Sequence, residues 1–593
     1  MKISKTQFIN NIKFSNSLAP EEIYRDSIEQ SAFSNELKLE DLMQIENRYK
    51  VESLIENVYE EESDETLDEK IDLQLEMMMP YYKELEILSG RAIKDRFGGN
   101  VIYDLDTFKQ KRFSYLHEEV ELFCFLDGYQ EDEEMIRVFE TKATTSNKFS
   151  FEKYNFKLND EKHPMFTKLS SGEFVPTENV MENLPDDYYK KEAKLLDLSD
   201  SLGKYIYDLA YQRFVYENDE NKTKKNRKYY LVVLNHEYIY NGKVDQYGKN
   251  IYENDLVRFY DLTTLVAKMD QQLKNDLDKV IKMIKDNIKV NESIINKNIP
   301  ERNSLYIYLD SHHGFRDENN KRLDLSDLIN NGIVSALDIP RKYLNRKNNQ
   351  IQREVIDSGK PYYNYNKIKD GIKQLKYPIY HLDFESFNAP LPRFRGETPY
   401  CQSVFQFSIH IETSPGKCDK DLDHYGYLAK DKRDNRRELV EKMLDIIKDD
   451  GGSILVYNIS FERTRLQEFQ LYFPEYKDRL ENIINRLFDL LHIVKNNKKF
   501  YELLGYSKEE ASEINFYHED LQGSYSIKHV LPIFSNLSYE NMPVSNGIDA
   551  MIAYNKFDQL NKKEYEKLYN DLINYCKQDT WAMVEILDAL RKL

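Results

Sequence analysis

The stretch HLDFESFNAP, which begins at His381, holds two acids, Asp383 and Glu385, inside an otherwise apolar run. Residues two apart in a β-strand share a face, so both carboxylates point the same way. Buried acids are costly unless a cation or a hydrogen-bond donor meets them. Carboxylate oxygens are the ligands that Mg²⁺ and Mn²⁺ prefer, which makes a divalent metal the first candidate. The alternative is that backbone donors or Arg393 satisfy both acids.

Two later segments carry polar residues that fit the same chemistry. VYNISFERTRL places Asn458 and Glu462 where a predicted strand turns into a helix. INYCKQDTWAMVEIL places Tyr575 and Asp579 four residues apart, and therefore on one helix face. Two metal ions held about 3.5–4 Å apart can activate water and stabilise the leaving oxygen of a phosphodiester. The three segments together strengthen the prediction of a divalent-metal site.

A second constellation lies in the first half of the chain. FLDGY supplies Asp127, and FETK supplies Glu140 and Lys142, which share a strand face. A hairpin would bring Asp127 against that pair, so that Asp127 and Glu140 hold a metal while Lys142 positions water or stabilises charge. YQRFVY adds Gln212 and Tyr216, four apart on a predicted helix. The alternative is an ordinary ion pair between Glu140 and Lys142.

The elements that must position these residues alternate between strands and helices. In the first half we expect a hairpin, a helix, a further strand and a long amphipathic helix, at 121–144, 202–217, 228–242 and 262–288. A helical hairpin is expected at 326–340. From Lys376 we expect a strand, an antiparallel neighbour, a helix and a strand, at 378–387, 405–412, 435–448 and 453–458. The fold class is therefore α/β.

The composition favours folded domains over disorder. The chain has 593 residues, of which 40% are hydrophobic and 32% charged, with 45 Tyr and 30 Phe. The start, MKISKTQFINNIKF, lacks the apolar stretch of a secretory signal, and we found no apolar run long enough for a membrane span. We expect a cytoplasmic protein with no membrane contact. The four cysteines form no CxxC pair, so we expect reduced thiols.

The formal net charge of −19 argues against a general electrostatic grip on nucleic acid. Two basic segments, NKTKKNRKYY (221–230) and PRKYLNRKNN (340–349), are candidates for local phosphate contacts. A solvated charged surface explains each of them equally well.

The C-terminal motifs resemble those of the DEDD exonucleases of the ribonuclease-H-like fold, in the variant whose third motif carries Tyr instead of His. The resemblance covers about 376–593. It implies that Asp383, Glu385 and Asp579 hold two Mg²⁺ or Mn²⁺ ions and that Tyr575 orients the attacking water. Glu462 stands where the family usually has Asp, and it is expected to act as a further ligand.

Two more residues are assigned roles by the same resemblance. Asp489, in RLFDLLHIV, fits a later accessory acid of such domains. GSYSIKHVLP (523–532) resembles the segment that lines the strand-end cleft, where Lys528 would contact phosphate. The alternative for Lys528 is an ordinary surface lysine.

The N-terminal series resembles the PD-(D/E)XK nucleases of the RecB type over roughly 1–290. The resemblance implies a centre of Asp127, Glu140, Lys142, Gln212 and Tyr216 with one or two metal ions held by the two acids. Many relatives also carry an iron-sulfur cluster bound by cysteines. Those cysteines are missing here, so no such cluster is expected.

The joined arrangement resembles an uncharacterised bacterial family, common in mollicutes, with a RecB-type nuclease-like domain before a DEDD-like domain. We expect a restriction-endonuclease-like domain (1–290), a helical connector (291–375) and a ribonuclease-H-like domain (376–593). The expected function is a metal-dependent nuclease acting on DNA that is single-stranded or has 3′ ends, in repair, defence or CRISPR-related processing. The alternatives are an RNA exonuclease and a nucleic-acid-binding protein with decayed nuclease folds.

Overall fold

The computed structural model describes residues 2–15, 71–104, 109–198, 200–285, 304–540 and 542–593. The chain forms two compact units, both of mixed α/β structure. The first contains 1–292 and 389–401, and the second contains 293–388 and 402–593. Nearly all of the expected connector, 291–375, thus belongs to the second unit. None of the described helices has the length and apolar character needed to cross a membrane.

The first unit is built on a seven-stranded sheet with the order β2-β5-β6-β11-β12-β10-β9. At its centre, β6 (Met135–Thr145) and β11 (Asn226–Leu234) are parallel, and β5 (Gly128–Glu131) and β12 (Val257–Asp261) flank them in antiparallel pairing. The outer strands are β2 (Asn100–Tyr103), β9 (Phe166–Lys168) and β10 (Phe174–Pro176). A smaller sheet joins β1 (Lys2–Ile3), β4 (Val120–Leu126) and β3 (Lys111–His117).

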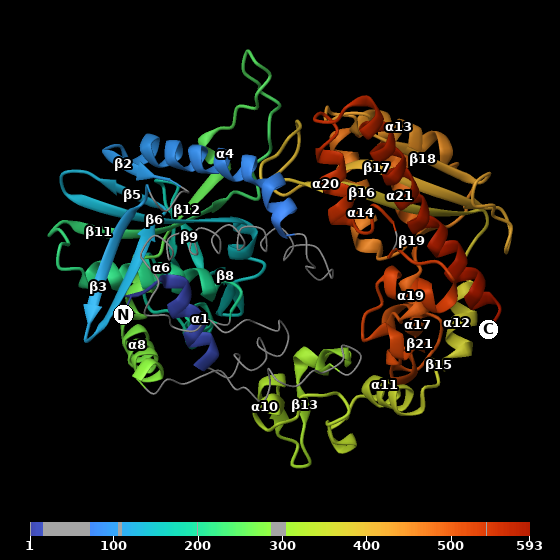
Figure 1. Ribbon diagram of the computed structural model, residues 1–593, viewed down its shortest axis with the longest axis horizontal. Coiled ribbons are helices and arrows are strands. Elements are labelled where there is room, and N and C mark those ends of the chain that lie inside the picture. Colours follow the sequence, from blue (N-terminus) through green and yellow to red (C-terminus); the bar gives the residue numbers. More distant parts are fainter. Residues whose placement is uncertain (1, 16–70, 105–108, 199, 286–303, 541) are drawn as a thin grey trace. The chain divides into compact units, whose positions relative to one another are not determined.

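Two helices cover opposite faces of the seven-stranded sheet (Figure 1). Helix α4 (Ile71–Phe97) ends in Phe97, whose ring centroid lies 5.5 Å from that of Phe139 on β6. Helix α6 (Gly203–Asn218) carries Gln212, which donates a hydrogen bond to Glu140, the next residue of β6. Because neighbouring side chains of a strand point to opposite faces, Phe139 faces α4 and Glu140 faces α6.

Two predicted elements of the first unit are divided in the structure. The first strand of the hairpin expected at 121–144 breaks at Asp127, so that β4 pairs with β1 and β3 while β5 pairs with β2 and β6. The helix expected at 262–288 is interrupted between α7 (Thr263–Ala267) and α8 (Asp270–Lys285). At this break Lys268 binds the carboxylates of Glu178 and Glu192, both at 2.6 Å. Residues 286–288 lie outside the described part.

The second unit contains a five-stranded sheet with the order β18-β17-β16-β19-β20. Strands β16 (Ile379–Asn388), β17 (Gln402–Glu412) and β18 (His424–Leu428) are antiparallel, whereas β19 (Ile454–Val456) and β20 (Leu487–Asp489) continue parallel to β16. Apolar side chains of β16 and β17 pack with those of α13 (Arg436–Ile446) and α14 (Ile459–Tyr472) in one core cluster. Helix α21 (Lys562–Arg591) crosses β16 and β17 (Figure 1).

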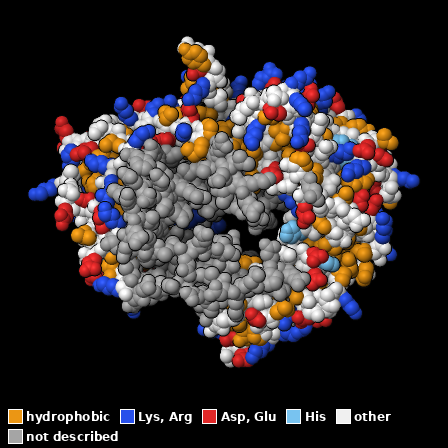
Figure 2. Space-filling view, in the orientation of Figure 1, with side chains coloured by type: hydrophobic (Ala, Val, Ile, Leu, Met, Phe, Trp, Pro, Cys, Tyr) orange, Lys and Arg blue, Asp and Glu red, His pale blue; other side chains and the backbone are white. Residues whose placement is uncertain are grey.

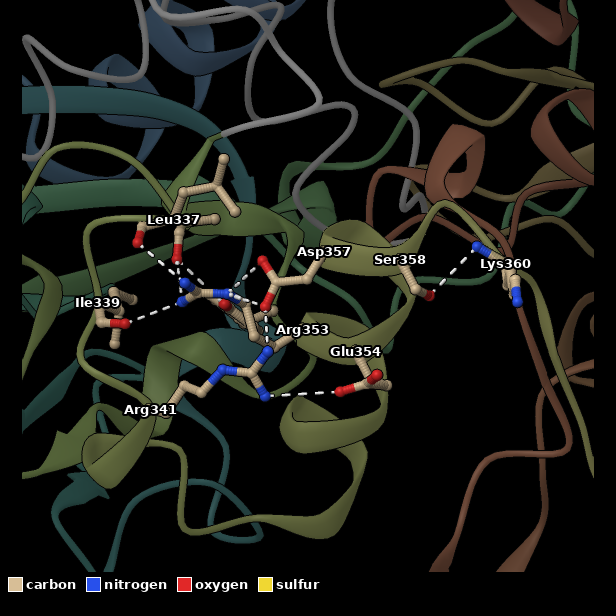
Figure 3. Close-up of polar contacts among 10 residues, drawn as sticks. Leu337, Ile339, Arg341, Arg353, Glu354, Asp357, Ser358 and Lys360 are labelled. Carbon is tan, nitrogen blue, oxygen red and sulfur yellow. Dashed lines mark hydrogen bonds and ion pairs between the residues drawn. The ribbon is translucent and has the colours of Figure 1, made fainter.

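The segment before this sheet contains short elements held by side-chain contacts. It includes β13 (Phe315–Arg316), β14 (Arg322–Leu323), α10 (Leu325–Asn330), α11 (Lys347–Ser358) and α12 (Tyr365–Ile372). The helical hairpin expected at 326–340 has its first helix, α10, and a turn at Gly332, but no second helix follows. The guanidinium of Arg353 instead donates hydrogen bonds to the carbonyls of Leu337 and Ile339 and pairs with Asp357 (Figure 3). These contacts hold 335–339 as a turn.

One face of β16 packs into the apolar cluster, and Leu382 lies on that face. Leu382 is fully buried in the apolar cluster. We expect Leu382→Ala to lower the free energy of unfolding by about 2–5 kcal/mol, because it leaves a cavity in that core. Leu471→Ala is the matched control, since Leu471 is 80% exposed; we expect it to change stability by less than about 0.5 kcal/mol. Urea unfolding measures both, and equal effects would contradict the assignment of this face as the core.

Candidate functional site

The other face of β16 presents acids to α21. Asp383 and Glu385 lie on this face, and the thiol of Cys576 on α21 lies 3.6 Å from Asp383 Oδ2. One ligand atom from each of the three residues falls within 4.8 Å of the others. Within the described part of the chain, this is the one group of three or more His, Cys, Asp or Glu side chains that meets the spacing for a metal ion.

Two further acids belong to this cluster. Burial and the negative charge of Asp579 raise the pKa of Asp383 well above its usual value. Burial and the charge of Asp383 raise the pKa of Glu462 in the same way. Glu462 is 2% exposed, and its Oε2 accepts no hydrogen bond from the described residues. Strand β16, helix α14 and helix α21 therefore bring Asp383, Glu462 and Asp579 close enough for their charges to interact, while Asp383 and Glu385 with Cys576 meet the closer spacing for a metal ion.

Two tyrosines border the acids. Tyr575 lies one turn before Asp579 on α21 and is 4% exposed. The ring centroid of Tyr539 is 6.2 Å from that of Tyr575, with the rings at 67°. Burial and the charge of Asp579 raise the pKa of Tyr539 well above its usual value, which keeps this phenol protonated. Tyr539 has no motif around it in the sequence, so only the folded structure identifies it.

Positive potential reaches the acids from two helices. Lys528 lies in the first turn of α19 (Ile527–Phe534), and its charge favours the ionised form of Asp383. Helix α20 (Gly547–Asn555) begins beside Glu385, since a Cβ added at Gly547 would lie 3.8 Å from Glu385 Oε2. A helix N-terminus favours a nearby negative charge. Lys528, the expected phosphate contact, is therefore close enough to Asp383 for its charge to act on that carboxylate.

Local backbone features set the direction of the side chains in this cluster. Pairing between β16 and β17 shifts register between Glu385 and Ser386, which is a bulge directly after the second acid. Asn458 precedes α14 with a φ of +71°, a conformation that Asn tolerates. Asp489 accepts hydrogen bonds from the backbone N–H groups of Asn458, Ile459 and Leu491 at 2.9–3.1 Å. Its carboxylate therefore shapes the turn that positions Glu462.

A buried polar layer fixes α21 on the sheet. Gln406 donates to the carbonyl of Leu572 at 2.9 Å, one turn before Tyr575. The hydroxyl of Thr580 lies 2.7 Å from Ser408 Oγ and 2.8 Å from His410 Nδ1. Burial lowers the pKa of His410 to about 3, so this imidazole is neutral at pH 7. These contacts hold Asp579, the residue before Thr580, at a fixed height above β16.

The first unit contains a separate cluster around Glu140. Glu140 Oε1 accepts from Lys142 Nζ at 2.9 Å and from Lys5 Nζ at 2.8 Å, and Oε2 accepts from Gln212 Nε2 at 2.5 Å. Lys142 also pairs with Asp208. Asp127 accepts a hydrogen bond from the backbone N–H of Thr141, between the two β6 residues. Asp127, Glu140, Lys142 and Gln212 thus lie together.

Tyr216 has different surroundings from these four residues. Two residues that the sequence analysis did not name, Asp208 and Lys5, also belong to the cluster. The ring of Tyr216 packs against Phe113 at 4.2 Å between centroids, and Arg227 lies over it. Asp208 stands four residues before Gln212 on α6, so helical spacing could have suggested it. Lys5 comes from the start of the chain and has no sequence signal that links it to Glu140.

The two clusters differ in how well their residues fit a divalent metal. In the second unit, the buried carboxylates of Glu385, Glu462 and Asp579 and the partly exposed one of Asp383 offer hard oxygen donors, and burial together with neighbouring acids raises the pKa values of Asp383 and Glu462. In the first unit, both oxygens of Glu140 already accept from Lys5, Lys142 and Gln212. A metal bound there must displace at least one of these partners.

Neither basic segment is a set of uncompensated charges. Lys225 pairs with Glu131 at 2.9 Å and Lys228 with Asp261 at 2.7 Å. Arg341 pairs with Asp357 (Figure 3), and Arg346 donates to the carbonyl of Gly314 at 2.9 Å. On the face drawn in Figure 2, basic and acidic side chains are interspersed over the coloured surface. These contacts favour a solvated charged surface over a phosphate track.

The known proteins that this chain resembles have no assigned activity. Residues 380–526 match a family model described as a domain of unknown function, DUF2779. The chain is 27% identical over 401 residues to the uncharacterized protein UU173 of Ureaplasma parvum, covering 58% of this chain and 54% of that protein. It is 26% identical over 258 residues to the uncharacterized protein MG366 of Mycoplasma genitalium, covering 40% and 36%.

These matches support the resemblance to an uncharacterised mollicute-type family. The chain spans about half, or less, of the length of the curated relatives it matches. No solved structure matches it significantly. The DUF2779 match contains Asp383, Glu385, Glu462 and Asp489, and it ends before Tyr575 and Asp579.

The raised pKa values predict how stability depends on pH. Because the folded state holds protons on Asp383 and Glu462 more tightly than the unfolded chain, ionisation penalises folding. This penalty is absent below the usual carboxyl pKa of about 4 and grows as pH rises toward the raised values. In EDTA, we expect the stability advantage of Asp383→Asn over wild type to increase with pH above about 4.

Urea unfolding of both proteins across a pH series measures this difference. The exposed acid Asp478 supplies the control, Asp478→Asn, whose difference from wild type should stay nearly constant over the same range. A difference for Asp383→Asn that does not change with pH would contradict the uncompensated acid cluster.

Proposed function

We propose that the protein is a metal-dependent nuclease that hydrolyses DNA phosphodiester bonds, with a 3′–5′ exonuclease centre in the second unit. The observation that carries this proposal is the convergence of Asp383 and Glu385, which together with Cys576 meet the spacing for a metal ion, and the charge interaction of Asp383 with Asp579 and Glu462. The order of the five strands and the position of α21 over the acids support a ribonuclease-H-like domain. The segments that carry these acids resemble motifs of the DEDD exonucleases, with Glu462 in place of the usual Asp.

Each residue of the cluster would have a separate role in hydrolysis. The four carboxylates would hold divalent metal ions, which when bound supply Lewis-acid activation of water and of the leaving oxygen. The hydroxyl of Tyr575 would orient the attacking water. The ammonium of Lys528, whose charge reaches Asp383, would meet a non-bridging phosphate oxygen. Cys576 would remain a thiol, because burial and the nearby acids raise its pKa well above the usual value.

Single-stranded DNA, or duplex DNA with 3′ ends, is the proposed substrate, and RNA is the alternative. The first unit is proposed as a RecB-type nuclease centre, supported by the grouping of Asp127, Glu140, Lys142 and Gln212. The cytoplasm is the proposed location. A nucleic-acid-binding protein with decayed nuclease folds is the competing function, and the departure at Glu462 motivates it.

Cleavage of end-labelled DNA and RNA tests the proposal. We expect the full chain to shorten single strands from the 3′ end with Mg²⁺ or Mn²⁺ and not in EDTA. Asp383→Asn should abolish this trimming because it removes a ligand charge without removing core volume, whereas the exposed-site control Asp478→Asn should keep it. Binding of DNA with no cleavage under any of these conditions would favour the decayed-nuclease alternative.

Glu462 provides a sharper test, because it stands where the DEDD pattern has Asp. We expect Glu462→Asp to keep or raise the trimming rate, since a carboxylate remains, and Glu462→Ala to lower it by about tenfold or more. The rates come from single-turnover digestion of a 5′-labelled strand. If Glu462→Ala is as fast as wild type while Asp383→Asn is inactive, Glu462 serves only the start of α14.

A further inference from the structure

Both oxygens of the Glu140 carboxylate in the first unit already accept hydrogen bonds from side chains of this chain. Glu140 is 2% exposed. Its Oε1 accepts from two ammonium groups, Lys5 at 2.8 Å and Lys142 at 2.9 Å, and its Oε2 accepts from the amide of Gln212. An ammonium group at such a distance lies near the position where a divalent ion would bind the same oxygen.

Lys5 is held beside Glu140 by the start of the fold. The preceding β1 pairs with β4 in parallel, with Ile3 opposite Leu122. Ser4 and Gln7 then close a reciprocal capping box at the start of α1 (Lys5–Ser15), at 3.1 and 3.2 Å. Phe8 is fully buried, with its ring centroid 5.0 Å from that of Tyr211 on α6. The backbone that carries the Lys5 side chain is therefore fixed in place.

Both lysines pair with acids of the cluster. Lys5 pairs with Glu140 at 2.8 Å, and Lys142 pairs with Glu140 at 2.9 Å and with Asp208 at 2.5 Å. Two cations thus stand among three carboxylates, those of Asp127, Glu140 and Asp208. A divalent ion approaching Glu140 meets repulsion from both lysines.

The balance of positive and negative charges in this cluster is the reverse of that in the second unit. There, Asp383 lies against the thiol of Cys576 with Glu385 close by, and Glu462 Oε2 accepts no hydrogen bond from the described residues. In the first unit the chain supplies the cations itself. The two clusters should therefore differ strongly in their affinity for divalent metals, although both contain converging acids.

We propose that the ammonium of Lys5 takes the place of a divalent metal ion beside Glu140, so that the first centre binds Mg²⁺ or Mn²⁺ only weakly until Lys5 is displaced. Removing Lys5 would open a metal site formed by Glu140 with Asp127 or Asp208. This inference concerns cation binding alone, and it holds whether or not either unit cleaves DNA.

Mn²⁺ binding to the full chain tests the proposal. The titration uses a background of Asp383→Asn with Asp579→Asn, which removes acids of the second cluster, and electron paramagnetic resonance measures free Mn²⁺. We expect Lys5→Met to bind Mn²⁺ about tenfold more tightly or better than the background, because the competing cation is gone. Lys5→Arg is the matched control and should stay weak. Adding Glu140→Gln to Lys5→Met should remove the gained affinity.

Two results would overturn the proposal. One is a folded Lys5→Met chain, with unchanged circular dichroism, that gains no Mn²⁺ affinity. The other needs no change at Lys5: if Glu140→Gln alone weakens Mn²⁺ binding in the background protein, then Glu140 binds the metal while Lys5 is present. We expect Glu140→Gln alone to leave the Mn²⁺ titration unchanged. This second comparison decides the question even if Lys5→Met fails to fold.

Discussion

The alternation of side chains along β16 is the constraint on which the second unit depends. Leu382 and Phe384 face the apolar cluster formed with α13 and α14, while Asp383 and Glu385 face α21. A strand buried on both faces normally has apolar side chains on each. Here one face is given to polar groups, so α21 packs on it through hydrogen bonds such as those of Thr580 with Ser408 and His410. The apolar face must supply most of the hydrophobic stabilisation of this sheet.

The period of each element accounts for what could be predicted from the sequence. Alternation in a strand groups Asp383 with Glu385 and Glu140 with Lys142, and helical spacing places Tyr575 near Asp579. The antiparallel pairing of β16 with β17 follows from alternation of apolar residues in both. Asp127 shows the limit of this approach. The run 122–126 before it is continuously apolar, and only the partners β1 and β6 divide the stretch around Asp127 between two sheets.

Contacts between distant segments could not be predicted. Lys5 reaches Glu140 across 135 residues, and Cys576 reaches Asp383 across 193. No local pattern records such a pairing, because it depends on which faces of two sheets and several helices come together. Tyr539 is a similar case, since its place near Asp579 depends on the path of the chain between α19 and α20. A single sequence identifies the residues of a motif better than it identifies the partners that complete their surroundings.

The acids of the second unit show that surroundings, more than residue type, separate a weakly compensated carboxylate from a structural one. Asp489 and Glu462 are both buried, and both belong to segments that resemble nuclease motifs. Three backbone N–H groups donate to Asp489, which is how a carboxylate stabilises a turn and a helix start. Glu462 Oε2 accepts no such bond within the described residues, and the charge of Asp383 adds to its burial. Ionised Glu462 is therefore less well stabilised by its surroundings than Asp489, whose charge is met by the backbone that it organises.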